Sequence, residues 1–164
     1  MNIVIRHAEP GDYEAAHRIF SAPKVIRGTM QLPFPSAELW RKRLAEPPEG
    51  LYTLVACVDD EVVGQLGLHT FPSRPRRRHA ANIGMAVRDD WQGKGIGTAL
   101  MEAALDLADN WLNVTRLELS VFADNDPAIR LYEKFGFVVE GTLVRYVLRD
   151  GELCDCLTMA RIKR

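Results

Sequence analysis

The chain has 164 residues, which suits one domain spanning residues 1–164 with a single full-sized core. Apolar residues make up 47% of it, charged residues 26%, and the formal net charge is -1, so no overall field favours nucleic acid or an anionic membrane. No apolar run approaches the roughly 20 residues that span a bilayer, and no signal peptide is visible at the start. Cysteine and histidine spacings indicate no metal site, and the three cysteines are expected as reduced thiols in a reducing cytoplasm.

The first half of the chain predicts more strands than helices. Alternating or apolar runs indicate the strands, while Asp12 and Ser36 are candidate N-caps of two helices. The stretch between those helices is rich in Pro and Gly and is expected as a loop. The expected elements are a strand at residues 3–8, a helix after Asp12, a helix after Ser36, a hairpin at 52–58 and 62–70, a loop at 71–78 and a strand at 79–87.

The second half alternates helices with strands and ends in a hairpin. A helix over residues 95–110 shows the 3.6-residue period, and a strand follows at 115–122. A short helix is expected between Asn125 and Gly136, and Asp150-Gly151 is a strong turn signal between two closing strands. The whole order predicts a mixed α/β fold with an antiparallel front half, unlike the regular alternation of a doubly wound sheet.

The stretch QGKGIG, residues 92–97, is a glycine-rich loop between an expected strand and an expected helix. Its glycines are spaced evenly by two, which excludes both the dinucleotide fingerprint and the P-loop. The remaining pattern is Gln92-x-x-Gly95-x-Gly97. Glycines let backbone N–H groups approach an anion, the helix start adds unpaired N–H groups, and Lys94 adds a charge, so the loop suits a pyrophosphate. The alternative is a strand-to-helix turn without a ligand.

A second spaced motif lies in the short helix near residue 130. It reads Asn125-x-x-Ala128-x-x-x-Tyr132-x-x-x-Gly136-Phe137. Ala128 and Tyr132 share one helix face because they are four residues apart. Alone, Tyr132 is more often a core residue than a catalytic one, but the glycine loop about 35 residues earlier reverses that preference.

Together the two motifs resemble the GNAT superfamily of acyl-CoA-dependent N-acetyltransferases. The resemblance covers the whole chain, since the order of elements is also theirs, and it implies a central, mostly antiparallel sheet flanked by helices. A closer likeness is to bacterial L-amino-acid N-acetyltransferases of the phenylalanine and methionine type. That likeness is based on the segments TMQLPFPS, RPRRRH, DNWL, VFADN and LRDGE.

The resemblance implies a site for acetyl-CoA as co-substrate, with no metal. The glycine loop would bind the pyrophosphate through its backbone, and the end of the strand before it would pair with the pantetheine arm. Asn125 would hydrogen-bond the pantetheine region, and Tyr132 would lie near the sulfur. The implied donor-site residues are Met85, Ala86, Val87, Gln92, Gly93, Lys94, Gly95, Ile96, Gly97, Asn125 and Tyr132.

Acetyl transfer requires a neutral amine to attack the thioester carbonyl. A backbone N–H near Met85 would stabilise the oxyanion, and the phenol of Tyr132 would protonate the leaving thiolate. Glu118, Ser120 and Asn82 are candidates for the base that takes the amine's proton, and Glu118 is the best of them if its strand face is the cleft. The alternative for Glu118 is an ion pair with Arg116 or another neighbour.

Two loops are candidates for binding the acceptor. Met30, Leu32, Pro33 and Phe34 either line an apolar pocket suited to a Phe or Met side chain or cover the core. The loop RPRRRH is either solvated or supplies one arginine, with Arg76 as the candidate, that grips the acceptor's carboxylate.

We therefore expect an N-acetyltransferase acting on a small primary amine, with a free apolar L-amino acid as the favoured acceptor. Rival expectations are an acetyltransferase for a protein N-terminus or a polyamine, and a CoA-binding sensor without catalysis. Nucleic acid and membranes are not expected as partners. The resemblance also implies a homodimer, formed through the closing strands.

Overall fold

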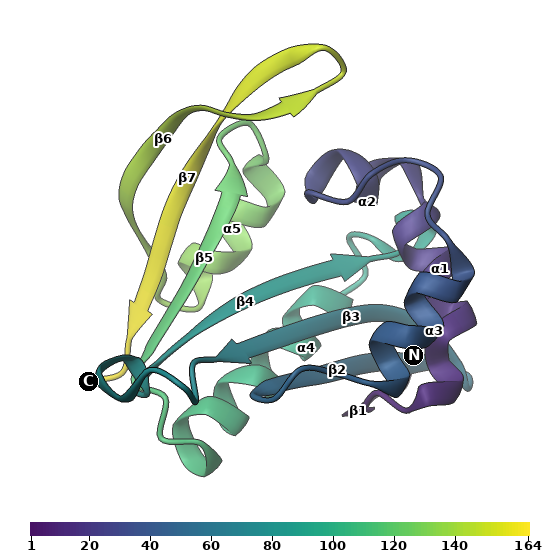
Figure 1. Cartoon of the computed structure of the whole chain (residues 1–164), viewed down its shortest axis with the longest axis horizontal. Coiled ribbons are helices and arrows are strands. Elements are labelled where there is room, and N and C mark those ends of the chain that lie inside the picture. Colours follow the sequence, from purple (N-terminus) through teal and green to yellow (C-terminus); the bar gives the residue numbers. More distant parts are fainter.

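The computed structural model describes residues 1–164, and seven strands form a single sheet (Figure 1). The strands are ordered β1-β2-β3-β4-β5-β7-β6, and every neighbouring pair is antiparallel except β4 and β5. This confirms the predicted mixed α/β fold with a mostly antiparallel sheet. The strands are β1 Ile3–His7, β2 Leu51–Val58, β3 Glu61–Thr70, β4 Ala80–Val87, β5 Arg116–Phe122, β6 Val138–Arg149 and β7 Glu152–Ile162.

Five α-helices flank the sheet. They are α1 Tyr13–Ser21, α2 Pro23–Gly28, α3 Ala37–Ala45, α4 Ile96–Asp106 and α5 Asp126–Lys134. The sequence predicted a loop where α2 lies. The signal for this helix is Pro23, because a proline in the first helical turn fixes φ and loses no hydrogen bond. None of the helices combines the length and the apolar composition that a bilayer span requires.

The two faces of the sheet carry separate clusters of buried side chains. On one face, which we call the α4–α5 face, alternate residues such as Leu54, Leu66 and Leu117 pack against α4 and α5. On the opposite face, called the α1–α3 face, intervening residues such as Val55 pack under α1 and α3. Successive side chains of a strand point to opposite faces, so the alternation in the sequence fixes which residues face α4 and α5 and which lie on the α1–α3 face, also called the cleft face below.

The sheet opens between β4 and β5. The two parallel strands pair only from Ala80 with Arg116 to Asn82 with Glu118, and beyond this point they diverge into a V (Figure 1). The carbonyl of His79 accepts from the N–H groups of Thr115 and Arg116, where β5 begins. Because backbone groups alternate sides along a strand, those of Met85 also face the V, where they have no strand partner.

Helix α2 lies across the open end of the V (Figure 1) and is attached to both arms. On the β4 side, the Lys24 N–H donates to Asp89 Oδ2 at 3.0 Å. On the other side, Arg27 forms an ion pair with Asp150 at the tip of the β6–β7 hairpin. Gly28 lies beside Asn125, whose Nδ2 would be 3.7 Å from an added Cβ. We call this helix the α2 strap.

Candidate active site

The glycine loop has a backbone geometry that exposes N–H groups. Gly93 and Gly95 adopt left-handed φ values of 73° and 86°, and no atom lies within 4 Å of where their Cβ atoms would be. Gly95 is the N-cap of α4 and has no side chain to cap it. The N–H groups of the first turn of α4 are therefore left without a protein acceptor and face an open surface, which is the arrangement that binds phosphate.

Gly97 holds the start of α4 tightly against its neighbours. A Cβ at this position would lie 3.1 Å from Leu131 Cδ2 and 3.4 Å from Met85 Cε. The glycine thus allows β4, α4 and α5 to meet at one point. The glycine loop and the strand predicted to hold the pantetheine arm are fixed relative to each other by this contact.

The other predicted donor residues of the loop fall into two groups. Gln92 and Ile96 have structural side chains: the Gln92 amide donates to the Val87 carbonyl at 2.9 Å, and Ile96 is buried in the core. Their backbone groups alone remain available to a ligand. The Lys94 ammonium lies 4.9 Å from the centroid of the Trp91 ring at the mouth of the loop, where it remains a source of positive charge.

Tyr132 lies on the α5 face that packs against the sheet. It is 8% exposed, its ring centroid is 5.8 Å from that of Phe137, and its hydroxyl makes no hydrogen bond within the chain. Burial raises the pKa of Tyr132 to about 12, so the phenol keeps its proton at neutral pH. The side chain therefore belongs to the core and also holds a proton that it can donate.

Asn125 caps the N-terminus of α5. Its Oδ1 accepts from the Ala128 N–H at 3.3 Å, while its Nδ2 is directed toward the α2 strap and has no hydrogen-bond acceptor in the chain. One end of this amide therefore positions α5, and the other end remains free to donate at the V.

Glu118 lies on the α1–α3 face of β5, next to the point where the strands diverge. It forms an ion pair with Arg77, and Arg116 Nη2 lies 3.8 Å from its other oxygen. The ion pair that was the alternative expectation for Glu118 is thus present, and it lies on the cleft face. Ser120 and Asn82 lie on the same face, since Ser120 is two residues from Glu118 on β5 and Asn82 on β4 pairs with Glu118.

The two loops predicted to bind the acceptor differ in what their side chains contact. In the β3–β4 loop, Arg77 reaches Glu118 from a short 3₁₀ turn, Pro75–Arg77, whereas Arg76 points to solvent and has no partner. The apolar segment 30–34 does not cover the core, because Leu32 is 80% and Phe34 98% exposed. Met30 and Pro33 are exposed as well.

A floor of glycines on the α1–α3 face was not predicted from the sequence. Gly67 on β3 pairs with Gly84 on β4, and a Cβ on Gly84 would have no atom within 4 Å. His69 stands beside this floor: its Nε2 would be 3.2 Å from a Cβ on Gly67. Glycines inside expected strands were the available signal, because they mark close approach of another group.

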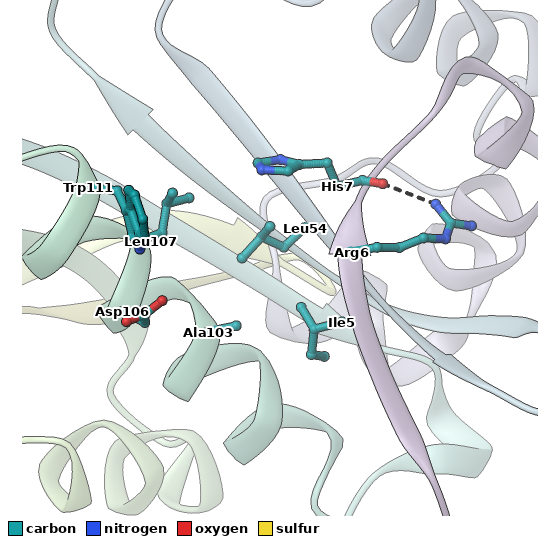
Figure 2. A pocket seen from close by; sticks show the side chains of 8 residues that line it. All are labelled: Ile5, Arg6, His7, Leu54, Ala103, Asp106, Leu107 and Trp111. Carbon is teal, nitrogen blue, oxygen red and sulfur yellow. Dashed lines mark hydrogen bonds between the residues drawn. The ribbon is translucent and has the colours of Figure 1, made fainter.

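A separate cavity lies at the other end of α4 (Figure 2). It has a volume of about 320 Å³ and an apolar floor that includes Ile5 and Leu54, with Trp111 as one wall. Arg6 points away from it and donates to the His7 carbonyl (Figure 2), and its guanidinium also donates to Asp12. The glycine loop begins α4, whereas this cavity adjoins the last turn of α4, so the cavity is not part of the predicted site.

The family model of the GNAT acetyltransferases matches residues 13–137 of the chain, a range that contains both the glycine loop and Tyr132. The chain belongs to the GNAT acetyltransferase family. It is 49% identical over 161 residues to the L-amino acid N-acetyltransferase AaaT of Escherichia coli, covering 98% of each chain. It is also 37% identical over 121 residues to an N-alpha-acetyltransferase of Saccharolobus solfataricus, covering 68% of this chain and 70% of that one.

The fold of this GNAT protein matches solved structures of the family. A spermidine N-acetyltransferase from Vibrio cholerae, in complex with CoA and spermine, superposes with a TM-score of 0.85. The two share 25% sequence identity, and the match covers 98% of this chain and 95% of the other. The divergence of β4 and β5, the glycine loop and the α5 tyrosine therefore lie within a shared architecture.

Proposed function

We propose that this GNAT enzyme transfers the acetyl group of acetyl-CoA to the α-amine of a free L-amino acid with an apolar side chain. The amine attacks the thioester directly. The observation that carries the proposal is the ion pair between Arg77 and Glu118 on the cleft face, beside the opening of the V. Its support from outside the chain is the 49% identity to an L-amino acid N-acetyltransferase.

The donor half of the proposal uses backbone groups. The free N–H groups of the α4 first turn bind the pyrophosphate of acetyl-CoA, with Lys94 adding charge. Met85, Ala86 and Val87 form the strand edge beside the pantetheine arm, and Asn125 Nδ2 donates to that arm from the other side of the V. The contacts of Gly97 with Leu131 and Met85 hold β4, α4 and α5 in place, so the site loses little entropy when it binds.

The chemistry then needs two positioned groups. The Met85 N–H, which faces the V without a partner, stabilises the oxyanion that forms when the amine adds to the carbonyl. Tyr132 donates its proton to the departing thiolate. Because its raised pKa keeps the phenol protonated, Tyr132 can act as a general acid throughout the neutral range.

The acceptor half of the proposal uses complementary charge. A free α-amino acid carries an ammonium and a carboxylate on the same carbon, and Glu118 and Arg77 offer the opposite charges side by side. We propose that Arg77, in place of the predicted Arg76, receives the carboxylate and that Glu118 holds the ammonium. Met30, Leu32, Pro33 and Phe34 follow the α2 strap and are proposed to contact the acceptor's apolar side chain.

The rival acceptors lack one half of this charge pattern. A polyamine has no carboxylate for Arg77, and the carboxylate of a protein acceptor lies far from its N-terminal amine.

Acetyl-CoA turnover, read by thiol release, is measured on phenylalanine, methionine, the amides and decarboxylated amines of both, spermidine and short peptides. We expect activity on the free amino acids and a large loss on their amides and amines. Equal activity on spermidine or peptides refutes the acceptor assignment, and binding of acetyl-CoA without any turnover indicates a sensor.

We also propose that the protein is a homodimer and works in the cytoplasm. The β6–β7 hairpin exposes Val144, Tyr146, Leu148 and Leu153, an apolar surface that a second copy would cover. All three cysteines are free thiols, which agrees with a reducing compartment. Light scattering on the wild type and on Leu148→Glu tests the dimer: we expect the mass to halve in the variant, and a monomeric wild type refutes it.

A further inference from the structure

We propose that His69 takes the proton from the acceptor's ammonium group before the amine attacks the thioester. The inference deepens the proposed function and rests on it, because it assigns a residue to a step of that reaction. No local pattern distinguishes His69 from the other histidines of the chain, and its role follows from how β3 and β4 pair.

The register of the sheet places His69 in the cleft. Its partner on β4 is Asn82, and Asn82 pairs with Glu118 on β5, so the three residues form one row across the α1–α3 face. The next row toward the open end of the V contains Gly67 and Gly84, and Gly84 directly precedes Met85.

The imidazole leans toward that open end. Its Nε2 would be 3.2 Å from a Cβ on Gly67, so the ring extends from its own row over the glycine row. Gly84 leaves the adjoining surface free of side chains, and nothing lies within 4 Å of its Cβ position. An amine resting on this glycine floor lies between His69 and the β4 edge where the thioester is proposed to bind.

His69 is also free to accept a proton. Neither ring nitrogen makes a hydrogen bond within the chain. Its neighbours on the same face of β2 are Leu51 and Thr53, and Asn82 faces it from β4, so the charged groups nearest in its row are Glu118 and its partner Arg77. Partial desolvation lowers the pKa of His69, which favours the neutral imidazole that can accept a proton.

Glu118 is less suited to this step. Its two oxygens already face Arg77 and Arg116, so its geometry favours holding a cation over taking a proton. A histidine is also by nature about two orders of magnitude more basic than a glutamate, and so closer to an amine. The two residues therefore have separate roles, in which Glu118 binds the ammonium and His69 Nε2 removes one proton from it.

The proton balance closes with the groups present. His69 takes the first proton from the ammonium and later releases it to water. The free amine forms the N–C bond, the C–S bond breaks, and Tyr132 protonates the thiolate. The second proton of the nitrogen then passes through water to Tyr132, so ammonium and thioester become amide, thiol and one released proton.

The test compares His69→Gln with the control His7→Gln, which alters an exposed histidine on the edge strand β1. With a free amino acid at pH 7 we expect His69→Gln to lower kcat/KM about 10- to 100-fold. The difference in kcat/KM between the variant and the wild type should disappear as the pH rises, because the amine then loses its proton without a base. The KM for acetyl-CoA should stay at the wild-type value, which shows that the variant is folded. His7→Gln should match the wild type at every pH.

An acceptor of low basicity isolates the step further. An aminooxy analogue of the amino acid is unprotonated at pH 7, so His69→Gln should turn it over within about 3-fold of the wild-type rate. Added imidazole should partly restore His69→Ala with the amino acid. An unchanged pH profile in His69→Gln, or an equal loss with the aminooxy analogue, overturns the proposal. Wild-type enzyme that ignores every amino acid overturns the proposed function instead.

Discussion

The donor side and the acceptor side of the V are held in place by different kinds of contact. On the donor side, buried packing sets the geometry: Gly97 lies against Met85 and Leu131, and Tyr132 is part of the core. On the acceptor side, exposed elements meet through ion pairs, such as Arg77 with Glu118 and Arg27 with Asp150. One side is therefore tied to the stability of the fold, while the other rests on surface contacts that are individually weak.

The two constructions suit two different ligands. The donor is the same molecule in every turnover, and a backbone cradle held by packing suits it because less freedom is lost on binding. Acceptors differ in charge and side chain, and exposed residues can be exchanged among related enzymes without disturbing the core. Substitutions on the donor side should therefore affect every acceptor alike, whereas those on the acceptor side should change which amine is used.

The largest effect is expected from Tyr132→Phe. Removing the hydroxyl deletes the proton donor but keeps the ring beside Phe137, so kcat should fall about 100- to 10,000-fold with every acceptor. The KM for acetyl-CoA should change little. Because the pKa of Tyr132 is about 12, the phenol contributes no loss of wild-type activity with rising pH until that range is approached. Steady-state kinetics on three unrelated amines measures this, and a loss confined to one amine would contradict the donor-side role.

A smaller effect is expected from Gly95→Ala, which forces a side chain into a left-handed N-cap. Displacing one or two N–H contacts to phosphate should raise the KM for acetyl-CoA about 10- to 100-fold, since each charge-assisted bond contributes about 1.5–3 kcal/mol. Gly136→Ala is the matched control, because Gly136 is also left-handed, with φ of 90°, but lies at the far end of α5. The control should lose similar stability in thermal unfolding and keep its KM; a similar rise in KM in both variants would remove the phosphate assignment from Gly95.

Arg77→Gln should act on the acceptor side alone. The variant loses the group proposed to bind the carboxylate, so the KM for phenylalanine should rise about 10-fold or more while that of its decarboxylated amine stays level. The KM for acetyl-CoA should not move. Arg76→Gln provides the comparison, since Arg76 faces solvent without a partner and should behave as the wild type. If Arg76→Gln raises the KM for phenylalanine and Arg77→Gln does not, the carboxylate site is assigned to Arg76, as the sequence suggested.

The donor side is the part for which the sequence carries local signals. The spacing of Gly93, Gly95 and Gly97 is dictated by backbone geometry, and left-handed φ values and close packing leave a local trace in residue type. The alternation of apolar residues similarly predicted the strands. Each of these signals comes from residues that are close together in the sequence.

The acceptor side could not be predicted because its geometry depends on contacts between distant segments. In the run RPRRR, nothing local distinguishes Arg77 from Arg76; the 3₁₀ turn and the position of β5 decide which one reaches Glu118. The alternation along β3 places His69 on the α1–α3 face, but only the pairing of β3 with β4 shows that it adjoins two glycines. Pro23 was a local signal for α2, but the Pro- and Gly-rich composition of the stretch around it favoured a loop.

The smallest effect is expected where the α2 strap meets the hairpin tip. Asp150 has a positive φ of 51°, which asparagine tolerates well, so Asp150→Asn removes the charge that pairs with Arg27 and keeps the turn. Both side chains are largely exposed, so the free energy of unfolding should fall by less than about 1 kcal/mol. If the ion pair holds the strap across the V, the KM for the acceptor should rise a few-fold at low salt, and that difference should disappear at high salt, where the wild-type pair is also screened.

Glu38→Gln is the control for that experiment, because it breaks an equally exposed ion pair, with Arg41 on α3, that lies away from the strap. It should lose comparable stability and leave the KM of the acceptor unchanged at both salt concentrations. A few-fold change confined to Asp150→Asn and to low salt means that surface contacts at the rim set access to the acceptor side. A change in the KM for acetyl-CoA instead would show that the strap belongs to the donor side, and that the division between the two sides lies elsewhere in the molecule.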